Sequence, residues 1–144
     1  MHAQLLTSSP VVLLGERFLR DYYYGLLPGA GMIRVAYATV DGRPAAFTAY
    51  TADPNGFMGA AIRRWWYRLA WVLAVSVLER PSRLGALWEA WRIMSTRGAG
   101  DGVSKGTGEI LSLGVLPEFT DPGFVQRSGL RIARDLIHLA VTDL

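Results

Sequence analysis

Residues 108–134 carry the pattern that most narrows what this chain can fold into. Glu109–Leu116 is apolar nearly throughout, which predicts a strand buried on both faces. After Pro117 come a polar loop, Gly129 and an amphipathic segment that predicts a helix over about residues 128–142. A strand, a glycine-containing turn and a helix can present backbone N–H groups to a phosphate, because a helix start carries partial positive charge. The segment therefore predicts a strand–turn–helix unit with an anion site at its turn.

The residues before this unit predict a helix followed by a β-hairpin. Ser8 or Ser9 with Pro10 is typical of a helix start, and the predicted helix runs from about Val11 to Leu27. Its apolar positions are four residues apart, at Leu14, Phe18, Tyr22 and Leu26. Asp41-Gly42 is a two-residue hairpin signal between the strands Met32–Val40 and Ala45–Thr51. The last helix of the chain is predicted to bury Leu130, Ala133, Ile137 and Ala140 or Val141.

A helical insert, residues 57–97, is predicted between the hairpin and the last strand. Its first helix spans Phe57–Glu79, with a basic start and a very apolar middle. Pro81 interrupts the helical pattern, and Ser82 can cap a second helix through about Met94. The Gly-rich stretch Thr96–Gly106 is predicted to be a mobile loop.

Composition limits the class of protein. A chain of 144 residues with half its residues apolar and 19% charged is predicted to fold as one domain, residues 1–144. The absence of cysteine excludes disulfides and thiolate metal sites, and it fits a cytoplasmic location. His2 and His138 are too few and too far apart to indicate a metal site. The net charge of +3 comes from scattered arginines, so no nucleic-acid partner is expected.

Together these elements predict an α+β fold, with a three-stranded, mainly antiparallel sheet, flanking helices and a helical insert between the second and third strands. The strand–turn–helix unit resembles the acyl-coenzyme A site of the GNAT N-acetyltransferase superfamily. In that family a strand ends in V-x-P, and Q/R-x-x-G-x-G/A leads into a helix. Val115, Pro117, Gln126 and Gly129 fit this pattern, whereas Arg131 stands where a Gly or Ala is expected.

The resemblance implies an acyl-CoA-dependent N-acyltransferase, or a truncated version of one. Acetyl-CoA or another acyl-CoA would be the co-substrate, and the acceptor would be an amine of a small molecule or peptide. The residues that the resemblance assigns to the coenzyme are the strand backbone at Leu113, Gly114 and Val115, and the phosphate-binding turn at Gln126, Arg127, Ser128, Gly129, Leu130 and Arg131.

Each of these roles has a structural alternative. The strand backbone can simply pair with a neighbouring strand, and a glycine with arginines near a helix start is often structural. Glu109 lies where several members of the family place a general base, and burial would make its carboxylate a better proton acceptor. Alternatively, Glu109 is a solvent-exposed residue at the start of a strand.

The chain departs from the family pattern in two ways. About six additional residues, Thr120–Val125, separate the strand from the turn. The family's first strand and everything after its third helix have no counterpart. The outer edge of Glu109–Leu116 is therefore expected to lack a partner, and an exposed apolar edge invites association. We expect a homodimer, or a partner chain that covers this edge or the apolar face of the last helix.

A second functional class is suggested by the insert. Its tryptophans and arginines are Trp65, Trp66, Trp71, Trp88, Trp91, Arg63, Arg64, Arg68 and Arg92. An amphipathic helix of this composition can lie at a membrane surface, so the alternative is a non-catalytic interaction or membrane-surface module. The structural alternative is a helical hairpin that covers the sheet.

Overall fold

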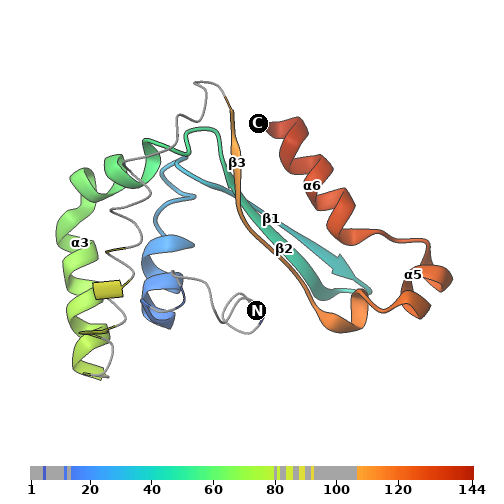
Figure 1. The fold of residues 1–144 in the computed structure, drawn as a ribbon, viewed down its shortest axis with the longest axis horizontal. Coiled ribbons are helices and arrows are strands. Elements are labelled where there is room, and N and C mark those ends of the chain that lie inside the picture. Colours follow the sequence, from blue (N-terminus) through green and yellow to red (C-terminus); the bar gives the residue numbers. More distant parts are fainter. Residues whose placement is uncertain are drawn as a thin grey trace.

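The computed structural model describes residues 14–79 and 107–144, with eight single positions elsewhere: Leu5, Val12, Pro81, Leu84, Gly85, Trp88, Glu89 and Arg92. Its elements are the π-helix η1 (Phe18–Tyr23), strands β1 (Arg34–Val40) and β2 (Arg43–Thr51), helix α3 (Phe57–Glu79), strand β3 (Glu109–Val115), the 3-10 helix η2 (Pro117–Phe119), and helices α5 (Pro122–Ser128) and α6 (Ile132–Asp143). The predicted α+β class is confirmed (Figure 1). The helical insert is confirmed as α3, between the second and third strands.

The strands form one antiparallel sheet in the order β1-β2-β3. The predicted hairpin is confirmed, because Asp41 and Gly42 connect β1 to β2 and both have positive φ, 51° and 74°. That backbone matches the twist of the adjoining strands, which is why Asp-Gly favours this turn. The hairpin therefore fixes which side chains of β1 and β2 share a face.

Only the central strand is buried on both faces. Every residue of β2 from Ala45 to Thr51 is buried, because β2 has a strand on each side and packed elements on both faces. The prediction that Glu109–Leu116 is buried on both faces is wrong. Most of β3 is only half-buried and Glu109 is exposed, because β3 pairs with β2 alone.

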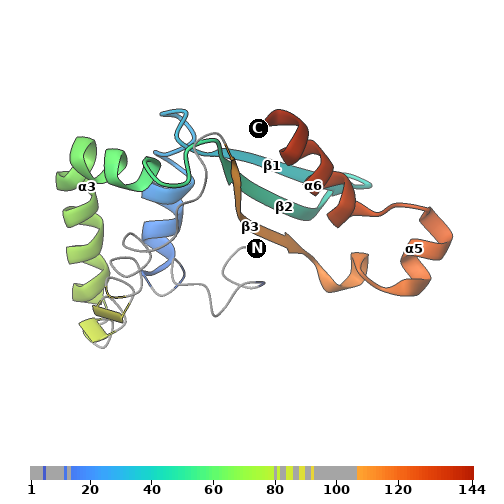
Figure 2. The ribbon, with the colours of Figure 1, turned by 45° about the horizontal axis from the view of Figure 1, so that its top comes forward.

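Two apolar clusters lie on opposite sides of the sheet (Figure 2). In one cluster, α6 packs Ile132 and Leu136 against Ala45 and Ala46 of β2. The predicted inner face of the last helix is correct at Ala140 but wrong at Leu130 and Ile137, which are exposed, while Ile132 and Leu136 are buried. The other cluster joins η1 to α3, and Leu111 of β3 packs against it.

Within the helix predicted over about Val11–Leu27, the structure has the π-helix η1 at Phe18–Tyr23. The amides of Tyr24 and Leu27 donate to the carbonyls of Leu19 and Tyr22, five residues earlier. The wider turn adds one residue, so Leu27 is fully buried and Leu26, which the fourfold spacing predicted, is only half-buried. Residues 6–11 and 13, which include the predicted helix start, lie outside the described part.

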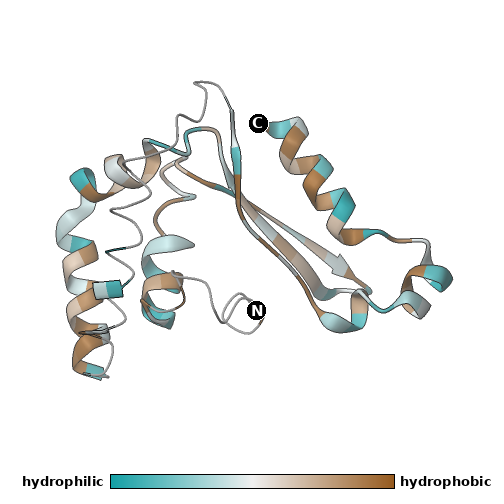
Figure 3. Ribbon diagram, in the orientation of Figure 1, coloured by the Kyte–Doolittle hydropathy of each residue, from teal (hydrophilic) through white to brown (hydrophobic). Residues whose placement is uncertain are grey.

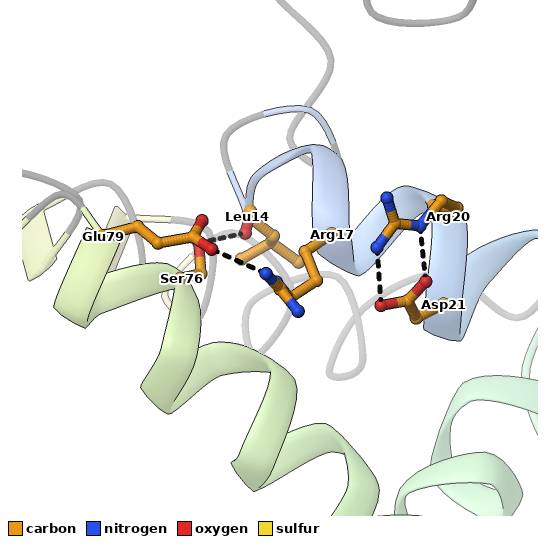
Figure 4. Close-up of polar contacts among 6 residues, drawn as sticks. All are labelled: Leu14, Arg17, Arg20, Asp21, Ser76 and Glu79. Carbon is orange, nitrogen blue, oxygen red and sulfur yellow. Dashed lines mark hydrogen bonds and ion pairs between the residues drawn. The ribbon is translucent and has the colours of Figure 1, made fainter.

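Helix α3 has the predicted bounds, with a kink at Trp65 (φ −129°, ψ 33°). Two contacts attach its second half to η1 (Figure 4). The buried hydroxyl of Ser76 donates to the carbonyl of Leu14 over 3.0 Å, and Arg17 pairs with Glu79 over 2.8 Å. Of the predicted second insert helix, Ser82–Met94, only Leu84, Gly85, Trp88, Glu89 and Arg92 are described, and Thr96–Gly106 lies outside the described residues. No described helix is long and apolar enough to cross a bilayer.

Candidate functional site

Strand β3 contains a bulge close to its start. Ser112 lies opposite Ala49 and Ile110 lies opposite Tyr50, so Leu111 is an extra residue in β3. On a regular strand, residues three apart point to opposite faces. The bulge changes this, because Glu109 pairs with Thr51 and Ser112 with Ala49, and Thr51 and Ala49 share a face. Glu109 and Ser112 are thus brought to one side of the sheet, and bulges commonly aim side chains in this way near active sites.

That side of the sheet meets two tyrosines of the η1 region. Tyr23 is 3% exposed, and its ring packs edge-on against Tyr24 with centroids 4.9 Å apart. Tyr24 in turn packs edge-on against Phe47 of β2, at 6.4 Å. These ring contacts hold both tyrosines against the face on which Ser112 lies.

Burial raises the pKa of both phenols. For Tyr23 the neighbouring Tyr24 and Glu109 raise the pKa further, while the Ser112 hydroxyl lowers the pKa of each phenol in part. Groups with a raised pKa stay protonated at neutral pH and can donate hydrogen bonds. The site therefore combines two neutral phenols with the carboxylate of Glu109.

The Ser112 hydroxyl is buried, and its Oγ has no hydrogen-bond partner of good geometry among the described residues. Buried polar atoms in native proteins are nearly always satisfied, so an unsatisfied one calls for an explanation. The phenols of Tyr23 and Tyr24 are its polar neighbours, so a polar atom of a ligand beside β3 could complete this hydrogen-bonding group. Sequence reasoning had given Ser112 no role in the site.

The outer edge of β3 has no partner strand in the described part of the chain. Leu113, Gly114 and Val115 lie on this edge, where sequence reasoning placed the contacts to the coenzyme arm. Gly114 also has a packing role, because a Cβ there would lie 2.5 Å from the Phe47 ring. The edge is available for backbone hydrogen bonds to a ligand or to another strand.

The predicted phosphate turn is shorter than expected, because helix α5 occupies most of the polar loop. Asp121 accepts a hydrogen bond from the Phe124 amide over 3.1 Å, and Pro122 follows as the first helical residue. Asp-Pro is a helix-start signal that sequence reasoning passed over. Gln126, Arg127 and Ser128 form the last turn of α5, so their amides lie in a helix and not in the extended turn that the sequence predicted.

Gly129 and Leu130 do not offer free amides either. Gly129, with φ of 69°, ends α5 in the left-handed conformation, and its amide donates to Val125. The Leu130 amide donates to the Ser128 hydroxyl over 3.2 Å. Arg131 has φ of −118°, a conformation that any residue adopts, which explains how an arginine replaces the expected glycine.

The start of α6 retains the properties of an anion site. Arg131 occupies the capping position without a side-chain hydrogen bond, so the first-turn amides have no cap. Arg131 and Arg134 are exposed and form no ion pair among the described residues. Asp135 also lies in this first turn and opposes part of their charge. If an anion binds in this region, the first turn of α6 offers the uncapped amides.

These features lie along one strand. The last residues of α6 lie beside the starts of β1 and β3, since Asp143 pairs with Arg34 over 2.7 Å and a Cβ on Gly108 would meet Leu144. Helix α6 therefore runs antiparallel to β3, and its first turn lies towards the carboxyl end of β3 (Figure 1). From that end, about 20 Å of free edge leads back to the bulge with Glu109 and Ser112.

No group of three or more His, Asp or Glu residues in the described ranges could hold a metal ion. The arrangement offers instead an anion site, a hydrogen-bonding strand edge and a cluster of proton donors and acceptors. Comparison with protein-family models, curated proteins and solved structures yields no match.

Proposed function

We propose that the protein is an acyl-CoA-dependent N-acyltransferase that transfers an acetyl or similar group to an amine. One observation carries the proposal: β3 has a free edge with the α6 start at one end and the Glu109–Ser112 bulge at the other. A ligand with phosphates, an extended amide-containing arm and a reactive thioester needs these three kinds of contact in this order. The resemblance of the strand–turn–helix unit to the GNAT superfamily supports the same function.

The coenzyme's pyrophosphate would bind the first-turn amides of α6, with Arg131 and Arg134 adding charge. Its pantetheine amides would pair with the free backbone at Leu113–Val115, as an added strand does. The thioester would then reach the bulge, beside the Ser112 hydroxyl and the phenols of Tyr23 and Tyr24. Phosphate contacts fix the register of the arm and so place the reacting carbonyl.

The chemical step is direct attack of the amine nitrogen on the thioester carbon. An N–C bond forms and the C–S bond breaks, with coenzyme thiolate as the leaving group. Glu109 is exposed and not buried, so an amine from solvent can reach its carboxylate. Glu109 would take the amine proton, and a phenol of Tyr23 or Tyr24 would give a proton to the thiolate.

A thermal-shift titration with acetyl-CoA tests the proposal. A ligand that binds the folded state raises the temperature of the unfolding midpoint. At a ligand concentration of a hundred times Kd, the added free energy of unfolding is about 2.7 kcal/mol. Arg134→Glu should weaken the shift, whereas Arg43→Glu, at an exposed arginine beside the hairpin turn, should leave it unchanged. No shift at millimolar acetyl-CoA with the unaltered protein would overturn the proposal.

The free edge of β3 also predicts an assembly. We expect a homodimer, or a complex with a partner chain, that covers this edge or the exposed apolar residues of α6, Ile137 and Val141. Light scattering at micromolar concentration should give twice the mass of the chain. A monomer at all concentrations would contradict the homodimer.

A further inference from the structure

We infer that α3 binds the surface of an anionic lipid bilayer, lying in the plane of the headgroups through its outward face. The proposal is independent of the acyltransferase function. It rests on how the second half of α3, after the kink at Trp65, distributes apolar and charged residues around its axis.

Most of this half of α3 is white to brown in Figure 3, and its residues divide between two opposite sides of the helix. The side packed towards η1 contains Leu69, Val72, Leu73 and Ser76, all buried or half-buried. The opposite side contains Tyr67, Trp71, Ala74 and Leu78, which recur with helical spacing and are all exposed. We call these four residues, with Trp66, the outer face of α3.

The outer face is large and uncovered. The side chains of Trp66, Trp71 and Leu78 are 65%, 70% and 80% exposed. A helix that is apolar on all sides is normally buried, and contiguous apolar patches on a protein surface mark interaction sites. No described residue covers this face. We therefore infer that the outer face of α3 binds a partner other than η1.

The charges on α3 identify the kind of partner. Its only charged residues before Glu79 are Arg63, Arg64 and Arg68, and among the described residues none of them forms an ion pair. Arg64 lies over the ring of Trp65, 5.0 Å from its centroid. Glu79, the one acid of α3, already pairs with Arg17 (Figure 4). The partner must therefore supply both negative charge and apolar surface.

A bilayer with anionic headgroups supplies both. Tryptophan and tyrosine rings favour the headgroup level, arginines bind the lipid phosphates, and Leu78 can enter the acyl region. A second copy of the outer face would offer the arginines no free carboxylate, because Glu79 is engaged. Nucleic acid would match the arginines but leave the apolar residues near Leu78 in water.

Vesicle co-sedimentation tests the inference. The unaltered protein should sediment with vesicles of equal parts phosphatidylcholine and phosphatidylglycerol at low salt. It should remain in the supernatant with phosphatidylcholine alone, and high salt should weaken the binding. On binding, tryptophan emission should shift to shorter wavelength as the rings leave water.

The variants separate charge from aromatic contacts. Arg63→Glu combined with Arg68→Glu should lower the partition coefficient by at least about 25-fold, since each basic residue near an anionic surface contributes about fivefold. Trp71→Ala should lower it severalfold. The matched controls are Arg43→Glu and Tyr37→Ala, an exposed arginine and an exposed aromatic on the hairpin, and neither should change binding.

Each of the other results would overturn the inference. Equal loss in the controls would show that general charge is responsible. Absence of the unaltered protein from the anionic pellet would rule out lipid binding. Self-association abolished by Trp71→Ala would identify a second copy as the occupant of the outer face. Circular dichroism of every variant confirms that it is folded before its binding is compared.

Discussion

Arginines lie at two exposed places in the molecule, and their neighbours differ. At the start of α6, Arg131 and Arg134 flank backbone amides without a cap, and the residues next to them in the sequence are not aromatic. In α3, Arg63, Arg64 and Arg68 lie in a helix interior, where the amides are already paired, and their neighbours are tryptophan and tyrosine. The first setting suits a small anion with directed hydrogen bonds, and the second suits an extended anionic surface. Arginine content alone would not distinguish the two.

The halves that carry these arginines also differ in how they are held. The α6 half packs small residues of β2 against one helix, whereas the η1–α3 half packs large aromatic residues around Tyr22. We expect Phe18→Ala, in the η1–α3 half, to destabilise the protein by about 3–5 kcal/mol through loss of a buried ring that stacks on Tyr22. Leu136→Ala, in the α6 half, should cost about 2–5 kcal/mol.

Urea unfolding followed by tryptophan fluorescence and by circular dichroism measures both variants. Coincident transitions would show that the two halves unfold together. In Phe18→Ala, the tryptophan fluorescence could instead change at a lower urea concentration than the circular dichroism of the sheet. The two halves would then be separate cooperative units.

Alkaline pH should act on the η1–α3 half. Burial raises the pKa of Tyr23, so the phenol stays neutral in the folded state at a pH where the unfolded chain ionises. Stability is therefore complete below about pH 10 and falls above it, by up to about 1.4 kcal/mol per pH unit for this residue. Tyr23→Phe should reduce the fall in the free energy of unfolding with pH. Urea unfolding in buffers at about pH 9, 10 and 11 measures it. The same slope in both proteins would show that Tyr23 does not titrate on unfolding.

How far the sequence predicted the structure depends on how local each signal is. The Asp41-Gly42 turn and the bounds of α3 follow from neighbouring residues, and both are confirmed. Helix α5 was not predicted, although Asp121-Pro122 is a local signal for a helix start. The β3 bulge and the shift from Leu26 to Leu27 depend on pairing and packing with distant residues, which no local pattern contains. The candidate site depends mainly on those distant contacts.

Gly129 separates the two short helices beside the anion site, and its substitution should have a smaller effect. A Cβ at Gly129 would meet nothing within 4 Å, so only the positive φ of 69° opposes Ala. Gly129→Ala should cost about 1–2 kcal/mol, the usual penalty for a left-handed residue with a side chain. Thermal unfolding measures it. Gly59→Ala is the comparison, because Gly59 lies in the helix α3 and a Cβ there would meet only the Arg63 guanidinium, at 4.0 Å.

The smallest effect is expected at Arg131, where the chain departs from the family pattern. If the first turn of α6 binds phosphate, the exposed guanidinium of Arg131 adds a screened attraction, and exposed ion pairs contribute about 0.2–1 kcal/mol. Arg131→Gly should therefore weaken acetyl-CoA binding by about two- to fivefold in calorimetry at low salt, and less at high salt. Tighter binding would mean that the side chain obstructs the phosphate. A third outcome is that Arg131→Gly leaves the affinity for acetyl-CoA unchanged while Arg134→Glu lowers it. That result would place the anion nearer Arg134 than Arg131.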